Sequence, residues 1–198
     1  YVAALTLEKD LSLTHGGVVV LIVAGNVLFG LAAPLAGWLS DRWSATGMIG
    51  VFFIGTGASM VMTGLSETGP GIALWLAATG TFASIYHPVG FAWLIRNAVN
   101  KGMALGVNGL FGGLGPAIAA LSAGALIDLY GWQAAFIIPG TVVLASGALY
   151  WVMIARGLIV ETKTDIRPMP SVSGSDRIRV FVVLAVTMLG TGLIYQAT

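Results

Sequence analysis

Long stretches without a single Asp, Glu, Lys or Arg alternate with short polar turns along this chain. A helix needs about 20 mostly apolar residues to cross the hydrocarbon core of a bilayer. The uncharged stretches therefore predict an all-α, polytopic membrane helix bundle. The predicted spans are residues 16–40, 47–65, 71–95, 103–127, 132–155 and 180–198. Residues 1–7 are predicted to end a preceding helix, and Glu8, Lys9 and Asp10 to form a polar loop.

Composition supports a chain built for lipid. Hydrophobic residues make up 57% of it, charged residues only 9%, and the mean hydropathy is +0.93, so little of its surface suits water. The absence of cysteine excludes a disulfide framework and a thiolate metal site, and no metal or cofactor is expected. A net charge of +1 gives no reason to expect nucleic acid. The chain starts without Met and stops inside an apolar run, so we expect a fragment that lacks its C-terminal half.

Basic residues lie almost entirely on one side of the predicted crossings. That side carries Arg42, Arg96, Lys101, Arg156, Lys163, Arg167, Arg177 and Arg179, and the other side carries only Lys9. Cytoplasmic loops collect Lys and Arg, so the Arg42 side is predicted to be cytoplasmic. The long polar segment 156–179 predicts a linker between a bundle at 1–155 and the start of a second bundle at 180–198.

A short pattern, Gly-x-Leu-x-Asp, occurs at residues 37–41 and again at 124–128, 87 residues further on. Three predicted crossings separate the two copies, so the copies face opposite sides of the membrane. An inverted-topology repeat has this property.

The first copy resembles the loop signature of the major facilitator superfamily, Gly-x-Leu-x-Asp-Arg followed by a basic tail. Gly37, Leu39, Asp41 and Arg42 match it, whereas residues 44–46 lack the basic tail. The segment from Gly131 to Phe136 also resembles the start of the family's sixth helix. The resemblance covers nearly the whole chain and implies a fold of inverted three-helix repeats, reaching from the end of helix 1 to helix 7.

The resemblance implies a conformational latch built from Gly37, Asp41 and Arg42. Asp41 can accept charge-assisted hydrogen bonds from a basic group at a neighbouring helix end, and Arg96 is the predicted partner. The alternative is a solvated turn in which Arg42 only anchors the helix at the membrane surface.

Gly115 and Pro116 resemble the glycine-rich Gly-Pro motif of family members that act as antiporters, although Ala119 and Ala120 replace its usual Gly pair. Pro116 lacks a backbone N–H and is predicted to kink its helix. Close helix packing without any bearing on exchange is the alternative.

The candidate chemistry lies on residues 79–88 of the predicted span 71–95, which is the fourth crossing when the helix that ends at residue 7 is counted. His87 is the one Asp, Glu, Lys, Arg or His residue well inside a predicted span, and intramembrane ionisable residues are functional candidates by default. A His-Pro pair here resembles the fosmidomycin-resistance-like efflux branch of the family. The predicted solute-cavity residues are Asn26, Thr79, Thr81, Ser84, Tyr86, His87 and Asn108. A neutral His87 that only packs, and asparagines that only join helices, are the alternatives.

We therefore predict a secondary active transporter that moves a small solute by alternating access, with proton-coupled efflux as its mode. The resemblance implies a multi-pass protein of the bacterial cytoplasmic (inner) membrane, with a solute, protons and the lipid bilayer as partners. Two alternatives stay open. One is a membrane-embedded enzyme that uses Ser84 and His87, and the other is a non-transporting sensor or scaffold on the same fold.

Overall fold

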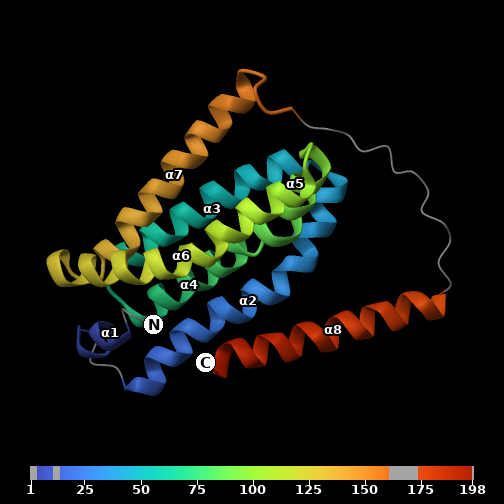
Figure 1. Ribbon diagram of the computed structural model, residues 1–198. Coiled ribbons are helices and arrows are strands. Elements are labelled where there is room, and N and C mark those ends of the chain that lie inside the picture. The colour runs from blue at the N-terminus through green and yellow to red at the C-terminus, as the bar shows by residue number, and fades with distance from the viewer. Residues whose placement is uncertain (1–3, 11–13, 161–173, 198) are drawn as a thin grey trace. The chain divides into compact units, whose positions relative to one another are not determined.

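The computed structural model describes residues 4–10, 14–160 and 174–197, and the elements in them are all helical (Figure 1). They are α1 (Ala4–Asp10), α2 (His15–Arg42), α3 (Ala45–Leu65), α4 (Gly69–Ala83), the π-helix η1 (Tyr86–Gly90), α5 (Phe91–Asn97), α6 (Lys101–Tyr130), α7 (Ala134–Ala155) and α8 (Gly174–Ala197). The chain forms two compact units, residues 1–162 and 163–198. Of the described helices, α2, α3, α6 and α7 are long and apolar enough to cross a membrane.

Polar residues in the turns fix where most of the long helices begin. The side chains of Thr14, Ser44, Thr68 and Asn100 each accept a hydrogen bond from a backbone N–H three residues on, at 2.9–3.3 Å. Such an N-cap satisfies a backbone donor that the start of a helix leaves unpaired. For these four helices the predicted starts differ from the observed ones by one or two residues, because hydropathy locates a span while capping sets its first turn.

The predicted span 71–95 is not one continuous α-helix. α4 ends at Ala83, η1 follows, and α5 completes the crossing. Pro88 lies in the π-helical segment and has no backbone N–H, which removes one helical hydrogen bond there. Hydropathy does not reveal such a break, because the residues on both sides of it are similarly apolar.

The polar loop predicted at Glu8, Lys9 and Asp10 is wrong, since all three residues belong to α1. Glu and Lys are good helix formers. Glu8 also pairs with His15 at the start of α2, so the side chains of the two helices meet there.

The predicted linker 156–179 is wrong for its last six residues, because α8 already begins at Gly174. Asp176 lies in the first turn of α8, where the helix dipole favours a negative charge. Residues 161–173 lie outside the described part of the chain.

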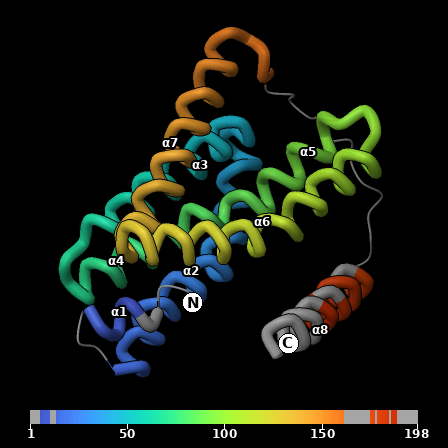
Figure 2. The backbone as a smooth tube through the Cα atoms, turned by 60° about the vertical axis from the view of Figure 1, so that its left-hand side comes forward, coloured from blue at the N-terminus to red at the C-terminus, as the bar shows by residue number. Residues whose placement is uncertain are grey.

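Helices of the first unit cross closely at glycines. α3 packs mainly against α7 and α4, and α2 packs against α4 (Figure 2). A Cβ atom on Gly80 of α4 would lie 2.0 Å from the carbonyl oxygen of Gly25 of α2. A Cβ atom on Gly57 of α3 would lie 2.8 Å from the carbonyl oxygen of Gly140 of α7. Such close backbone contact supports helix association in lipid, where hydrophobic exclusion is absent.

Two buried apolar clusters hold opposite ends of this unit. Ala36, Ala45, Met48, Ile49, Ile85 and Val89 form the cluster at the Arg42 end, and Leu7, Val18, Leu21, Ile72 and Trp132 form the other. The first cluster joins the η1 region to α2 and α3. It therefore positions the side chains that η1 carries.

The helix bounds repeat with nearly the offset of the Gly-x-Leu-x-Asp pattern. α2 begins at His15 and α6 begins at Lys101, 86 residues further on. Gly25, at the crossing of α2 with α4, has its counterpart 87 residues on in Gly112 of α6. The order of the elements therefore fits the inverted three-helix repeat predicted from the sequence.

Candidate functional site

The π-helical turn η1 carries Tyr86 and His87 on its surface. Both residues are exposed in this unit, whereas Ser84 and Ile85 just before them are buried. A π-helical turn adds a residue to the helix repeat and frequently occurs at functional sites. Gly37 of α2 lies against the turn, since a Cβ there would come within 3.5 Å of a side-chain carbon of Pro88.

His87 lies among three aromatic rings. Its ring centroid is 5.6 Å from that of Phe29 on α2 and 5.9 Å from that of Tyr86, in both cases edge to face. The ring of Phe91 lies 5.9 Å away and almost parallel, at 13°. No hydrogen bond joins the His87 ring to another residue in the part of the chain that the structure describes. Its ring nitrogens are therefore available to a proton or a ligand.

A hydrogen bond connects this turn to α6. The Tyr86 hydroxyl donates to Oδ1 of Asn108 at 2.6 Å, across 22 residues of sequence. Beside this bond lies a cavity of about 310 Å³. It is lined by Tyr86, His87, Phe91, Asn108, Gly109, Phe111 and Gly112. We call it the His87 cavity.

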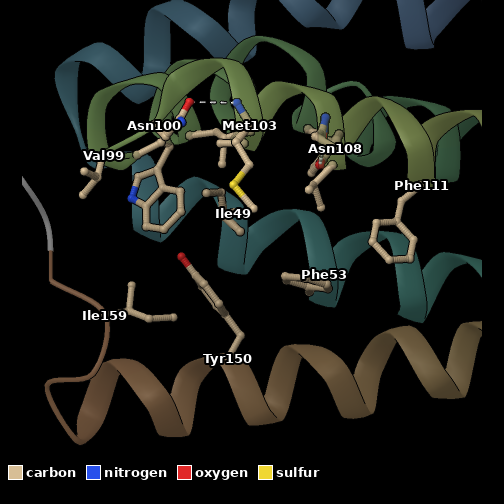
Figure 3. A pocket seen from close by; sticks show the side chains of 16 residues that line it. Ile49, Phe53, Val99, Asn100, Met103, Asn108, Phe111, Tyr150 and Ile159 are labelled. Atoms are coloured by element: carbon tan, nitrogen blue, oxygen red, sulfur yellow. Dashed lines mark hydrogen bonds between the residues drawn. The ribbon is translucent and has the colours of Figure 1, made fainter.

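A larger and mostly apolar cavity of about 790 Å³ adjoins the His87 cavity and shares Tyr86, Asn108 and Phe111 with it. Figure 3 shows Asn108 and Phe111 on α6, facing Phe53 of α3 and Tyr150 of α7. The Tyr150 hydroxyl donates to the carbonyl oxygen of Thr46 at 3.0 Å. Tyr150 is thereby anchored to the start of α3.

The family model of the Major Facilitator Superfamily matches residues 1–197. This chain belongs to that superfamily. Its members are membrane transporters, and together with the long apolar helices the membership makes this chain an integral membrane protein. No curated protein matches the sequence.

The Asp-Arg motif of the superfamily ends α2 instead of forming a turn. Asp41 and Arg42 are its last residues, and the guanidinium carbon of Arg42 lies 4.0 Å from the ring centroid of Trp38, a cation–π contact. The predicted ion pair of Asp41 with Arg96 is not formed. Arg96 Nε instead donates to the carbonyl oxygen of Ala92 at 3.1 Å, and neither ion pair found among the described residues involves Asp41.

The Gly-Pro motif lies on the helix that forms one wall of the His87 cavity. α6 runs from Lys101 to Tyr130 through Pro116, and Gly115 has open space where a side chain would start. Pro116 has no N–H, so the carbonyl group of Gly112, four residues earlier, loses its usual helical partner. Gly112 lines the His87 cavity. The motif therefore leaves a backbone carbonyl group in the wall of the cavity without its usual helical donor.

Thr79, Thr81 and Ser84 do not line the His87 cavity. Thr79 Oγ1 lies 3.0 Å from Ser59 Oγ of α3, to which it donates, so it joins two helices. Ser84 is buried, and its hydroxyl donates to the carbonyl oxygen of Thr81 at 2.7 Å. Thr81 and Ser84 line a separate apolar hollow between α2, α3 and α4. Hydroxyl groups satisfied in this way need no solute.

The Ser84–His87 pair of the enzyme alternative is not formed, because the Ser84 hydroxyl donates within its own helix segment while His87 contacts aromatic rings. Asn26 is exposed on α2 and does not line the His87 cavity. The structure thus brings together Tyr86, His87 and Asn108 and places the other predicted cavity residues elsewhere.

Sequence reasoning missed Phe29, Phe91, Phe111, Gly109 and Gly112 as parts of this site. Phe91 carries a signal, because residues four apart share one face of a helix and Phe91 follows His87 by four. The contacts of His87 with α2 and of Tyr86 with α6 depend on tertiary packing, which no local pattern shows.

Proposed function

We propose that this chain is part of a secondary active transporter that moves a small solute across the membrane by alternating access. Superfamily membership supports transport. The His87 cavity carries the more specific proposal, because Tyr86, His87 and Asn108 bring polar groups together inside an otherwise apolar bundle. Polar and ionisable groups inside a membrane protein commonly mark the solute or proton pathway. The polar segment after α7 then tethers this bundle to a second one, against which it rocks.

His87 is the proton-binding group of this proposal, and efflux driven by a proton gradient is its direction. Imidazole is the side chain whose charge ordinarily changes between about pH 5 and 8. The nearly parallel ring of Phe91 can stabilise an imidazolium through a cation–π contact. The sequence contains no Gly-x-x-x-x-Gly-Lys-Ser/Thr loop for ATP. The basic side of the bundle, with Arg42, is proposed to face the cytoplasm of a bacterial inner membrane.

The experiment compares His87→Phe with His15→Ala in the full-length protein reconstituted into proteoliposomes. His15 is the other histidine of this chain and lies outside the cavity, paired with Glu8. Phenylalanine at position 87 keeps a ring against Phe29 and Phe91 but cannot bind a proton. We expect flux of a solute found by a binding screen to lose its dependence on pH in His87→Phe and to keep it in His15→Ala. An unchanged pH profile in His87→Phe would remove His87 from proton coupling.

A further inference from the structure

We propose that the His87 cavity binds a flat, uncharged ring solute that carries a hydrogen-bond acceptor and a hydrogen-bond donor on its edge. This inference rests on the proposed function and specifies the class of solute. Four features of the cavity support it: its aromatic side, its bare backbone side, its unpaired polar groups and its lack of fixed charge.

Aromatic rings form one side of the cavity. The ring planes of His87 and Phe91 are almost parallel, at 13°. A third ring with the same orientation can therefore stack against them. Tyr86 and Phe111 line the cavity as well. Aromatic rings favour offset-stacked and edge-to-face neighbours over saturated ones of the same size. The volume of about 310 Å³ is at the lower end of the range for small-molecule sites, so one or two fused rings fit.

Bare backbone forms the other side. Gly109 and Gly112 of α6 line the cavity, and a Cβ atom on either would meet nothing within 4 Å. The space that side chains would occupy at these positions is therefore open. A flat ring can approach the helix backbone closely only where residues lack a side chain.

The cavity offers one donor group and one acceptor group to a solute. Asn108 accepts the Tyr86 hydroxyl through Oδ1, which leaves its amide NH₂ free to donate. The carbonyl group of Gly112 lacks its helical donor because residue 116 is proline. A solute with a lactam-like edge, one C=O and one N–H, satisfies both groups.

No Asp, Glu, Lys or Arg is among the residues that line the cavity. While His87 is neutral, an ionised solute would find no opposite charge in the cavity, and burying an unpaired charge in a membrane interior is unfavourable. This favours uncharged solutes over organic ions of equal size.

The test measures binding of four small probes to the full-length protein in lipid nanodiscs by equilibrium dialysis. Quinolin-2(1H)-one is flat and uncharged and has the required edge. Its N-methyl derivative lacks the donor, its octahydro derivative keeps the lactam edge but is not flat, and quinoline-2-carboxylate is ionised. We expect quinolin-2(1H)-one to bind at least tenfold more tightly than each of the other three. Equal binding of the N-methyl compound, the octahydro compound or the carboxylate, or no detectable binding of quinolin-2(1H)-one up to 1 mM (roughly the weakest affinity of interest), would overturn the inference.

Alanine substitutions locate the binding. Gly109→Ala and Gly112→Ala add a methyl group to the cavity wall, whereas Gly106→Ala and Gly113→Ala add one on the same helix at positions that do not line the cavity. We expect affinity for quinolin-2(1H)-one to fall at least tenfold in the first pair and to change less than twofold in the second. Equal effects in both pairs would place the binding elsewhere.

The two proposals fail separately. A protein that transports another solute with a His87-dependent pH profile, but shows no preference for the flat probe, contradicts only the solute class. A protein that binds the flat probe as expected, but moves no solute, contradicts the transporter proposal.

Discussion

Hydroxyl groups in an apolar span can serve packing alone, and Thr79 is the clearest case. Its hydroxyl links α4 to Ser59 of α3 and does not line the His87 cavity. We expect Thr79→Val, which keeps the shape and removes the hydroxyl, to destabilise the bundle by about 0.6 kcal/mol, the average value of an interhelical hydrogen bond in a membrane protein. Reversible unfolding in mixed micelles measures this. Lost solute binding at unchanged stability would place Thr79 in the pathway after all.

Tyr86 is expected to act through its hydroxyl as well as its ring. Tyr86→Phe removes the donor to Asn108, and a hydrogen bond contributes on the order of 1 kcal/mol. Because the freed Asn108 amide is then no longer held in place, we expect solute affinity to fall about fivefold, the equivalent of that energy. Tyr130→Phe, at the exposed end of α6, is the matched control and should leave affinity unchanged. Equal affinities for wild type and Tyr86→Phe would contradict the role of this bond.

At the scale of the element, the crossing of α2 and α4 depends on the absence of side chains. Gly80→Ala would place a Cβ atom 2.0 Å from the backbone of Gly25, so the helices must separate. Overpacking of this kind costs about 1–3 kcal/mol. Gly30→Ala on α2 is the control, because a Cβ there meets nothing within 4 Å. We expect a lower unfolding temperature for Gly80→Ala only, and equal temperatures for both variants would contradict the crossing geometry.

The helices of the bundle could be predicted from the sequence because each is a long apolar run bounded by polar residues. α3, predicted at 47–65, spans Ala45–Leu65 in the structure. The break in the fourth crossing could not be placed in this way. Pro88 is its local signal, but whether a proline kinks a helix, ends it or gives a π-helical turn depends on what packs around it, here Gly37 of α2.

The candidate site was predictable only in part, for a related reason. His87 stands out because a histidine in an apolar span is unusual, and Tyr86 is its neighbour. Thr79 and Ser84 lie close to His87 in sequence but face other helices. Asn108 joins the site across 22 residues through a single hydrogen bond with Tyr86. Which polar side chains share a cavity depends on helix rotation, and apolar runs without clear periodicity do not specify that rotation.

At the scale of the whole molecule, the proposed threading places Arg42 and Asp128 on opposite sides of the membrane. Arg42 ends α2 and Asp128 lies near the end of α6, and three crossings separate them. The chain contains no cysteine, so a thiol introduced at either position is the only one this chain contributes. We expect a membrane-impermeant thiol reagent to label Arg42→Cys from the cytoplasmic side and Asp128→Cys from the other side. Labelling of both variants from one side would contradict the threading.

Alternating access at the His87 cavity requires that Phe111 be reachable in turn from both sides of the membrane, which thiol accessibility at this position measures. Phe111 lines both cavities and is exposed in this unit. The measurement uses Phe111→Cys in the full-length protein, in which any cysteine of the remaining sequence has been replaced. The protein is reconstituted into vesicles in both orientations. We expect an impermeant reagent to label this thiol from each side of the membrane and bound solute to slow labelling from both. Labelling from one side only, under every gradient applied, would contradict alternating access.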